Sequence, residues 1–515
     1  MKLTTLTRPL SSIVSKPVLT SIGDGDPEIT GVTADSRRVR PGFAFVALAG
    51  EHADGHRYIS SALAAGAAAI IASSSRAAQF EAACRDAGAA LITADDAALA
   101  LGALCSQFYG EPGRALTLVG VTGTNGKTTV THLLETILRD VGRRVGLVGT
   151  LGQRMAGDAA AEPDAYESTG HTTPMAEDLQ ATLAQMRDAG ADTVVMEVSS
   201  HALSQRRVYG CRFQCAIITN LTQDHLDFHR TMADYASAKA LLFSGLTPPA
   251  AAVINLDDPW AQTFLEACPP GIHPLTYALE NPSADVRAVE ATYTIDGASF
   301  RAVTPQGERL VTLLIAGRFS VYNALAALAG ALAMGVPLAA AADSLAAVRG
   351  VRGRFEVVAS EPAVIVDYAH TPDGLENVLA AARQVTPSGG RLWVVFGCGG
   401  DRDATKRPKM GAIAERLADA VIVTSDNPRS EDPQQIISDI LSGIQTFDAQ
   451  RMAVNADRRS AIRQAIDGAG PRDVVVLAGK GHEDYQLLAD GAIHFDDREE
   501  AQQYLASRRA EASRP

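Results

Sequence analysis

The chain has 515 residues, of which 46% are hydrophobic and 20% charged, and its formal net charge is −13 at pH 7. This length exceeds one hydrophobic core, so two to four domains of a soluble globular protein are expected. The acidic balance disfavours generic binding to a nucleic-acid backbone, which needs a basic surface, so we predict no nucleic-acid partner.

The first block, residues 1–110, is expected to form a small N-terminal α/β domain. Residues 43–47 are predicted to be a strand, and the alanine-rich residues 59–73 a helix followed by a strand. No catalytic motif is visible in this block, so substrate docking is a suitable role for it.

The second block, residues 111–350, alternates between short apolar segments and amphipathic ones. Strands are expected at 115–121, 145–148, 193–198, 215–219 and 251–255, and helices at 128–140 and 175–189. This order predicts a central, doubly wound, mostly parallel sheet. Residues 324–342 carry no charge and are long enough to span a bilayer, but Gly335-Val336-Pro337 would break such a helix. A buried helix followed by a turn is therefore expected, and no membrane span.

The third block, residues 351–515, repeats the alternation. Strands are expected at 363–366, 391–396, 420–423 and 473–477, and helices at 375–385 and 411–417. A second, Rossmann-like α/β domain is predicted here.

Cysteine usage and the start of the chain favour a cytoplasmic location. None of the six cysteines has Cys-x-x-Cys spacing, and no zinc-binding set is complete, so a reducing compartment fits best. Residues 1–19 lack the continuous apolar segment of a secretory signal.

The clearest functional motif is a glycine-rich turn between an expected strand and an expected helix, Gly120-Val-Thr-Gly123-Thr-Asn-Gly126-Lys127-Thr128-Thr129. Glycines let backbone N–H groups approach phosphate oxygens, and the helix N-terminus adds positive potential. Lys127 can reach the β- and γ-phosphates, and Thr128 can ligate Mg²⁺. The motif departs from the strict phosphate-loop pattern because Val121 occupies the first glycine position. It predicts a nucleoside triphosphate and leaves the acceptor open; the alternative is a turn without a ligand.

Acidic and imidazole side chains follow two further strands. Glu197 ends the strand at 193–198, at the sheet edge where ligands bind, and a carboxylate suits Mg²⁺. Asp224, His225, Asp227 and His229 follow the strand at 215–219 and favour a site beside the phosphate loop. Their spacing assigns no individual roles, and a surface salt bridge is the alternative for Glu197.

Together these segments resemble the Mur ligase family over nearly the whole chain. The matching motifs are Gly-Thr-Asn-Gly-Lys-Thr-Thr, Glu197-Val-Ser-Ser-His201, Asp224-His225, Tyr322-Asn323-Ala-Leu-Ala-Ala, Gly353-Arg354-Phe-Glu, Asp367-Tyr-Ala-His370-Thr-Pro-Asp, Gly397-Cys-Gly-Gly-Asp-Arg402-Asp, Asp426-Asn427-Pro428-Arg429 and Gly479-Lys-Gly-His-Glu483. The first is shared with folylpolyglutamate synthases. The last four resemble members that extend UDP-N-acetylmuramoyl-L-alanyl-D-glutamate.

The resemblance implies a monomeric three-domain ligase that forms peptide bonds between an acid and an amino acid. Its domains would bind the UDP-sugar, ATP and the incoming amino acid in that order, with Mg²⁺ as cofactor. ATP would convert the D-Glu γ-carboxylate into an acyl phosphate, because oxide is too poor a leaving group, and the amine of meso-2,6-diaminopimelate would then attack. Positioning and charge neutralisation are the work left to the protein in this step of peptidoglycan precursor synthesis.

The resemblance also implies roles for single residues. The implied catalytic residues are Lys127, Glu197, His225, Lys239 and Arg354. The implied ATP contacts are Gly123, Thr124, Asn125, Gly126, Lys127, Thr128, Thr129, Asn323 and Asp367. The implied metal ligands are Thr128, Glu197, His225 and a carbamylated Lys239, since an ammonium cannot ligate a cation. On sequence alone, Lys239 is instead expected to be a solvated helix lysine.

Substrate contacts are implied in the same way. The UDP-sugar contacts are Ser36, His52, Ala53, Thr172, Thr173, Ser199, Gln205 and Arg207. The diaminopimelate contacts are Arg402, Asp426, Asn427, Pro428, Arg429, Gly479 and Glu483. Diaminopimelate differs from lysine by a distal carboxylate, which a planar guanidinium such as that of Arg429 matches well. The alternative for Arg429 is a turn-capping or surface arginine.

Three alternatives stay open. A folylpolyglutamate synthase shares the phosphate loop, but Asp-Asn-Pro-Arg and the block before the loop disfavour it. A lysine-adding muramyl ligase differs at Arg429 and its neighbours. A phosphate-loop NTPase switch or motor would turn over nucleotide without an amino acid.

Overall fold

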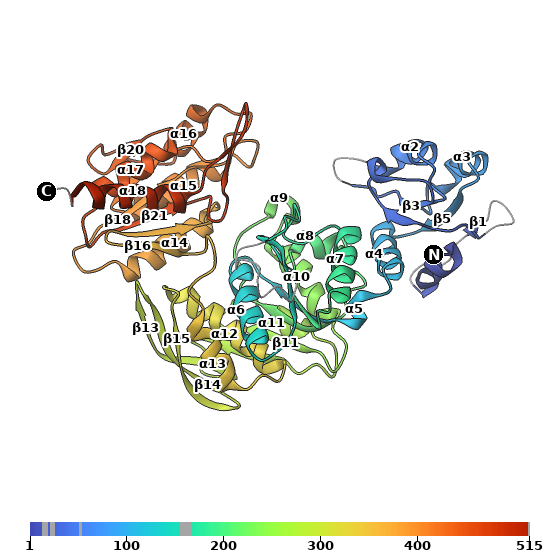
Figure 1. Ribbon diagram of the computed structural model, residues 1–515, viewed down its shortest axis with the longest axis horizontal. Coiled ribbons are helices and arrows are strands. Elements are labelled where there is room, and N and C mark those ends of the chain that lie inside the picture. The colour runs from blue at the N-terminus through green and yellow to red at the C-terminus, as the bar shows by residue number, and fades with distance from the viewer. Residues whose placement is uncertain (13–18, 21–25, 51–53, 155–165, 513–515) are drawn as a thin grey trace.

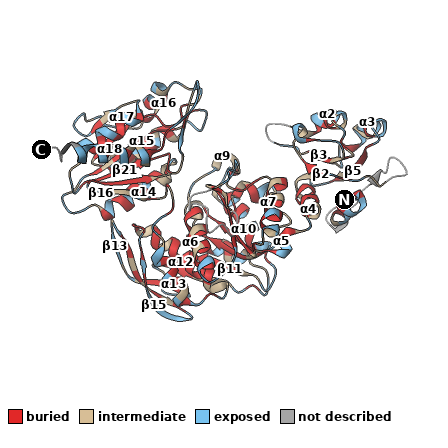
Figure 2. Cartoon of the chain, viewed as in Figure 1, coloured by how far each residue is buried: buried red, intermediate tan, exposed pale blue. Residues whose placement is uncertain are grey.

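Three α/β units follow one another along the chain, each built around its own sheet (Figure 1). The computed structural model describes residues 1–12, 19–20, 26–50, 54–154 and 166–512. The first and third units lie on opposite sides of the central one. Figure 2 shows the buried residues concentrated in the strands and on the inner faces of the helices.

The first unit is a five-stranded sheet in the order β1-β5-β4-β3-β2, parallel except for β1. Its strands are β1 (Leu19–Thr20), β2 (Gly31–Thr33), β3 (Phe43–Val46), β4 (Ala69–Ser73) and β5 (Ala90–Ala94). Its α-helices are α1 (Leu3–Thr7), α2 (Ile59–Ala64), α3 (Glu81–Asp86) and α4 (Ala97–Phe108). The predicted strand at 43–47 and the helix and strand at 59–73 are confirmed.

The apolar core of the first unit continues into residues of the second unit. Its buried apolar cluster includes Ala176, which lies beyond the second unit's first strands, and Tyr209 lies partly buried against it. Tyr209 packs closely against Gly102 of α4: a Cβ at Gly102 would lie 2.8 Å from the Tyr209 Cβ. Helix α4 therefore packs on residues that come much later in the chain.

The central unit is a ten-stranded sheet in the order β15-β14-β13-β12-β11-β10-β6-β9-β7-β8. Its strands are β6 (Thr117–Thr122), β7 (Val145–Gly149), β8 (Gly152–Arg154), β9 (Thr193–Glu197), β10 (Phe213–Ile218), β11 (Ala251–Asn255), β12 (Leu275–Ala278), β13 (Val286–Thr294), β14 (Gly297–Thr304) and β15 (Gly307–Leu313). Its helices are α5 (Pro112–Ala115), α6 (Lys127–Asp140), α7 (Ala176–Asp188), α8 (Ser200–Ser204), α9 (Leu226–His229), α10 (Met232–Ser244), α11 (Ala261–Ala267), α12 (Arg318–Ala333) and α13 (Leu338–Ala347).

The predicted parallel core of this sheet is confirmed, and an antiparallel extension was not foreseen. Strands β7, β9, β6, β10, β11, β12 and β13 pair in parallel, whereas β13, β14 and β15 pair antiparallel. The uncharged stretch that was weighed as a membrane span is the buried α12, a turn at Gly335 and α13. Within the described residues no helix is long and apolar enough to cross a bilayer.

The chain reverses its direction of winding at β6. This strand lies between β9, which belongs to the half wound first, and β10, which begins the other half. Helix α6 follows β6 and buries Val130, Leu133, Leu134 and Ile137 on one face, at helical spacing. In an open α/β sheet, ligands bind at the carboxyl ends of the strands beside such a reversal. The glycine-rich turn after β6 occupies this place.

The third unit is a six-stranded sheet in the order β16-β17-β21-β18-β19-β20, parallel except for β16, with a separate hairpin of β22 and β23. Its strands are β16 (Glu356–Ser360), β17 (Ala363–Asp367), β18 (Leu392–Phe396), β19 (Ala420–Val423), β20 (Met452–Val454), β21 (Val474–Ala478), β22 (Tyr485–Leu488) and β23 (Gly491–His494). Its helices are α14 (Pro372–Val385), α15 (Lys406–Leu417), α16 (Pro433–Leu441), α17 (Arg458–Gly468) and α18 (Asp497–Ala512). Two apolar clusters, one against α14 to α16 and one against α17 and α18, show that both faces of the sheet are covered.

Candidate active site

The glycine-rich turn is held in shape by the residues that follow β10. A Cβ at Gly123 would lie 1.8 Å from the Thr219 hydroxyl, so only glycine fits there. The Thr219 hydroxyl donates to the Asn125 carbonyl at 2.6 Å, and the Thr124 N–H donates to the Asn220 carbonyl at 2.8 Å. The turn is therefore preformed, with its backbone N–H groups near the start of α6.

Lys127 lies folded over this turn. Its Nζ donates to the carbonyls of Gly123 and Thr124, both at 2.8 Å. Desolvation lowers the pKa of Lys127, and the charges of Glu197 and Asp224 oppose that effect. The lysine charge is thus directed at the turn and lies within electrostatic reach of both carboxylates.

Glu197 is fully buried at the end of β9, with a carboxylate fixed by one neighbour. Its Oε1 accepts from the Thr150 N–H at 2.8 Å, and its Oε2 accepts from the Thr150 hydroxyl at 3.0 Å. Thr150 was missed in the sequence, because a lone threonine after a strand gives no pattern. Such a fixed, buried carboxylate is chemically suited to a metal ion and is no surface salt bridge.

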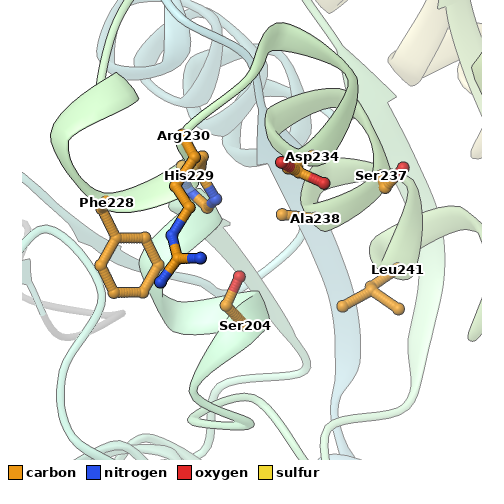
Figure 3. Close-up of a pocket in the computed structure, with 8 residues that line it drawn as sticks. All are labelled: Ser204, Phe228, His229, Arg230, Asp234, Ser237, Ala238 and Leu241. Carbon is orange, nitrogen blue, oxygen red and sulfur yellow. The ribbon is translucent and has the colours of Figure 1, made fainter. Parts of the chain in front are cut away.

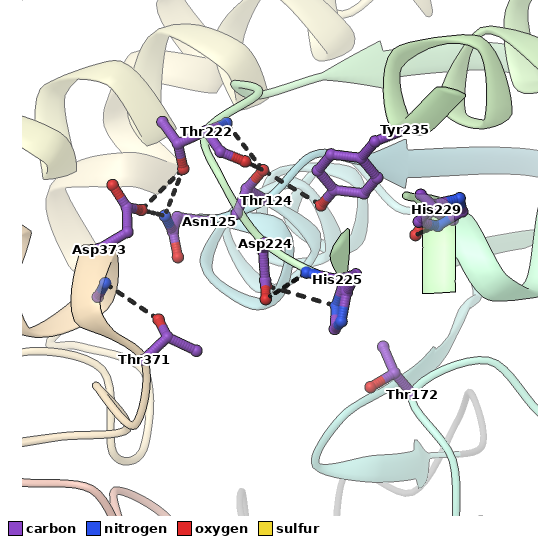
Figure 4. A network of polar contacts seen from close by, with 12 residues as sticks. Thr124, Asn125, Thr172, Thr222, Asp224, His225, His229, Tyr235, Thr371 and Asp373 are labelled. Carbon is purple, nitrogen blue, oxygen red and sulfur yellow. Dashed lines mark hydrogen bonds and ion pairs between the residues drawn. The ribbon is translucent and has the colours of Figure 1, made fainter. Parts of the chain in front are cut away.

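The segment after β10 brings His225 and Lys239 to the same place. His225 has a left-handed backbone with φ 53°, its Nε2 lies 3.4 Å from Asp224 Oδ2, and its ring lies 4.7 Å from that of His201. Desolvation lowers the pKa of His225, the neighbouring Asp224 charge opposes this, and the charges of His201 and the two lysines add to the lowering. Figure 4 shows Asp224 and His225 side by side, close to Thr124 and Asn125 of the turn, with Tyr235 above them. The side chain of Asp227 lies outside the described residues.

Lys239 is not a solvated helix lysine. Its side chain on α10 is 1% exposed, and its Nζ donates to the Gly123 carbonyl at 2.8 Å and lies 4.6 Å from the centre of the Tyr235 ring. Desolvation lowers the pKa of Lys239 well below its usual value, and the Lys127 charge adds to this. Burial thus favours the neutral form of this amine, which is the form that can react with CO₂.

The third unit reaches the turn through two side chains. Arg354 Nη2 donates to the Thr128 hydroxyl at 3.1 Å. The Asp373 carboxylate at the start of α14 accepts from Asn125 Nδ2 at 2.6 Å and from the Thr222 hydroxyl at 2.7 Å (Figure 4). Asp373 was quoted within a motif but given no role, since a partner 248 residues away is not visible in a sequence.

The other two predicted nucleotide contacts differ in their surroundings. Asn323 abuts the turn, because a Cβ at Gly126 would lie 2.3 Å from its Oδ1. Asp367 accepts from the Phe355 N–H at 2.7 Å, and burial raises its pKa to about 6. The Arg354 charge opposes that rise. Asp367 therefore supports the segment that carries Arg354.

Five of the predicted UDP-sugar contacts gather behind Glu197. Thr172 Oγ1 lies 3.1 Å from Thr150 Oγ1, and Thr173 Oγ1 donates to the Glu197 carbonyl at 2.9 Å. Arg207 Nη1 donates to the Thr173 carbonyl at 3.0 Å. Ser199 and Gln205 complete the group, through hydrogen bonds to Thr173 and Arg207 respectively.

The remaining UDP-sugar contacts belong to the first unit. Ser36 begins a short 3-10 helix that Asp35 caps. His52 and Ala53 lie outside the described residues. The first unit meets α7 near this helix, where Glu177 accepts from the Thr33 hydroxyl and the Ala34 N–H, both at 3.3 Å.

The predicted amino-acid contacts lie on three loops at the carboxyl edge of the third sheet. Asn427 Nδ2 donates to Glu483 Oε2 at 2.8 Å, and Lys480 Nζ lies 3.2 Å from the same oxygen. Burial raises the pKa of Glu483, and the Lys480 charge opposes that rise. Lys480, which is fully buried, was not among the predicted contacts.

The arginines of this region lie at its rim. Arg429 has a left-handed backbone with φ 52°, and its Nη1 donates to the Gly400 carbonyl at 2.9 Å. Arg402 is exposed, and a Cβ at Gly399 would touch both guanidine-bearing side chains. Gly479 stands against Asp426, and Pro428 is buried within the same loop. A cavity of about 410 Å³ opens between Arg429 and the β22–β23 hairpin.

A metal ion has partial support from the donor set. The described residues contain no group of three or more His, Cys, Asp or Glu side chains arranged to hold one. Mg²⁺ keeps several waters and needs only one or two protein oxygens, however, and the Glu197 carboxylate and the Thr128 hydroxyl are of that kind. The residues therefore fit a magnesium ion that phosphate oxygens and water also hold.

A second cavity, of about 500 Å³, lies on the outer side of α9 and α10 (Figure 3). It is lined by Ser204, Phe228, His229, Arg230, Asp234, Ser237, Ala238 and Leu241. The sequence placed His229 in the acid and imidazole cluster expected beside the phosphate loop and gave no role to the other seven residues, and most of the eight are exposed. The chemistry gathers on the other side, around the glycine-rich turn.

Three family profiles match most of the chain. The Mur ligase family catalytic domain matches residues 28–109, the Mur ligase middle domain 121–331, and the Mur ligase glutamate ligase domain 353–481. In Synechococcus elongatus, a UDP-N-acetylmuramoyl-L-alanyl-D-glutamate--2,6-diaminopimelate ligase is 48% identical over 488 residues, 94% of this chain and 95% of that protein. The ligase of the same name in Bacillus velezensis is 45% identical and covers 96% and 98% of the two chains.

Solved structures of similar fold include a ligase of the same name. A UDP-N-acetylmuramoyl-L-alanyl-D-glutamate--2,6-diaminopimelate ligase, 36% identical, matches with a TM-score of 0.66 over 93% of this chain and 95% of that one. A folylpolyglutamate synthase of Mycobacterium tuberculosis, complexed with ADP and AMPPCP, is 22% identical and matches with a TM-score of 0.60 over 74% of this chain and 92% of that one. The latter likeness concerns the fold alone.

Proposed function

This chain belongs to the Mur ligase family, and from that premise we propose that it joins 2,6-diaminopimelate to UDP-N-acetylmuramoyl-L-alanyl-D-glutamate in an ATP-dependent reaction of peptidoglycan precursor synthesis. Ligases of this name match this chain over nearly the full length of both proteins, at 44% to 48% identity.

One observation carries the proposal: residues of the proposed UDP-sugar site and a side chain of the third unit both lie beside the turn after β6. Behind it lie Glu197 and the threonines that contact it, and in front of it Arg354 reaches the Thr128 hydroxyl from the third unit. An acid held on one side and an amine held on the other would therefore meet at the terminal phosphate. Such convergence lowers the barrier mainly by orientation.

The chemistry assigned to these residues is charge neutralisation. The backbone N–H groups at the start of α6, Lys127 and Arg354 would hold the phosphates and the acyl phosphate in place, and the amine would attack as phosphate leaves. Mg²⁺, when bound, supplies further neutralisation, and Thr128, Glu197 and His225 would hold it. Lys239 is proposed to be carbamylated, because its burial beside the turn favours the neutral amine that this reaction needs.

The three units are proposed to divide the substrates. Residues 1–110 would take the UDP-sugar, 111–350 ATP, and 351–515 the amino acid. Arg402, Arg429 and Glu483 would read the distal end of diaminopimelate, whose carboxylate lysine lacks. A cytoplasmic location is proposed as well, since the cysteines described are all free.

The test is phosphate release by the purified protein with ATP, magnesium and UDP-N-acetylmuramoyl-L-alanyl-D-glutamate. Release is expected only when diaminopimelate is added. Turnover with lysine instead would indicate the lysine-adding activity, and turnover with a folate the synthase activity. Release without any amino acid would indicate a simple NTPase and would refute the ligase proposal.

A further inference from the structure

Tyr368 stands where three chain segments touch through their backbones. Its N–H donates to the Gly353 carbonyl at 3.0 Å. A Cβ at Gly481 would lie 2.6 Å from the Tyr368 Cβ, and a Cβ at Gly353 would lie 2.1 Å from the His482 nitrogen. Both glycines have left-handed backbones, with φ 66° at Gly353 and 53° at Gly481. Only glycine at both positions allows the segments to cross this closely.

The crossing links the two sides of the proposed reaction. Arg354, which reaches Thr128 in the phosphate-binding turn, follows Gly353 directly. Glu483, which lies in the amino-acid site, comes two residues after Gly481. Tyr368 therefore contacts the backbone that carries each of these groups.

The ring of Tyr368 also supports the guanidinium. The Arg354 Cζ lies 4.7 Å from the ring centre, which is a cation–π distance. The rings of His370 and His482 lie 4.5 and 4.8 Å from the same ring and enclose it. Arg354 Nε is buried without a hydrogen-bond partner in the described part of the chain, so the ring is a substantial part of what holds this cation.

We propose that Tyr368 is a positioning residue, which seats Arg354 against the phosphate-binding turn and fixes its distance from the amino-acid site. This inference rests on the proposed function. The electron-rich face of the Tyr368 ring, and not its hydroxyl, holds the Arg354 guanidinium.

The first experiment compares Tyr368→Phe with Tyr368→Leu by steady-state kinetics. The phenylalanine variant is expected to keep kcat within about threefold, because the ring stays. The leucine variant is expected to lose about tenfold to thirtyfold in kcat, with little change in the KM for the UDP-sugar substrate. In an Arg354→Ala background, the same leucine change should add less than about twofold, since the group it positions is gone.

The matched control is Tyr504→Leu, which removes another ring under an arginine: the partly buried Tyr504 ring on α18 has its centre 5.4 Å from the Arg463 Cζ on α17. Its activity is expected to be unchanged. A leucine variant with unchanged kcat, or one whose loss simply adds to that of Arg354→Ala, would overturn the proposal.

A second series of variants keeps the size and shape of the side chain, so folding is preserved. Phenylalanine analogues with one, two and three ring fluorines at position 368 keep the shape while weakening the negative face of the ring. A stepwise fall in kcat with fluorination is expected, and a constant kcat would overturn the proposal. Wild-type protein without diaminopimelate-dependent turnover would instead refute the proposed function, so the two failures are distinguishable.

Discussion

Replacing Lys480 by methionine should loosen the proposed amino-acid site by an amount that can be calculated from the structure. Lys480 Nζ lies 3.2 Å from Glu483 Oε2, and the two side chains are 0% and 14% exposed. At that distance, with an effective dielectric constant of about 20, the attraction is ~5 kcal/mol. Breaking a buried pair by removing one partner typically costs about 3–5 kcal/mol, and the residual exposure of Glu483 favours the lower end. A local loss of ~3 kcal/mol is expected, or roughly a hundredfold faster amide hydrogen exchange in residues 426–429 and 480–487.

The same substitution also changes how the stability of the protein depends on pH. The pKa of Glu483 is already raised by burial, and losing the Lys480 charge raises it further. The folded protein then binds more protons than the unfolded chain between the two pKa values of Glu483, so its stability falls as pH rises through that window. Diaminopimelate use should move the opposite way, improving at higher pH as Glu483 ionises.

The double variant Lys480→Met/Glu483→Gln is the control. It should recover protection to within about 1 kcal/mol, because no charge is left unpaired, without recovering the use of diaminopimelate. Exchange in Lys480→Met within threefold of the wild type would refute the reasoning, since it would mean that solvent, not Lys480, compensates Glu483.

Three further changes test the site. Lys127→Ala should abolish acyl-phosphate formation yet leave binding of the UDP-sugar, measured by calorimetry, nearly intact; retained turnover would rule out its phosphate role. Arg429→Ala should lower kcat/KM for diaminopimelate by ~2–5 kcal/mol if it makes a desolvated charge pair, and a change of a few tenths would make it a surface residue. Lys239→Ala should stop turnover, and added acetate, which offers the carboxylate oxygens of a carbamate, should restore part of it; an activity unaffected by the substitution would contradict the carbamate.

Local patterns made much of the fold predictable from the sequence. The strand and helix around the glycine-rich turn follow from a short apolar run and from spacing at one helix face, and both depend on near neighbours only. Strands β13 to β15 were missed although each pairs with its neighbour in the chain, because the residues of β15 are mostly exposed and those of β13 alternate between more and less buried, so no continuous apolar run marks these strands.

Only the parts of the site that depend on near neighbours in the chain were predictable from the sequence. The turn and Glu197 could be found because a strand end is itself a local feature. The surroundings of Lys239 could not, since its burial depends on the Gly123 carbonyl, 116 residues away. Asp373 and Thr150 are of the same kind: each contributes through a contact that only the folded chain creates.

The packing of α4 on Tyr209 and Ala176 also bears on how the protein can be divided. A fragment that stops at residue 110 would lose both partners and expose the apolar face around Gly102 to water. Such a fragment should aggregate or bind hydrophobic dyes, whereas one that retains residues 1–350 keeps the cover together with the whole central sheet. Screening of ligands for the first unit is therefore better done on the longer piece.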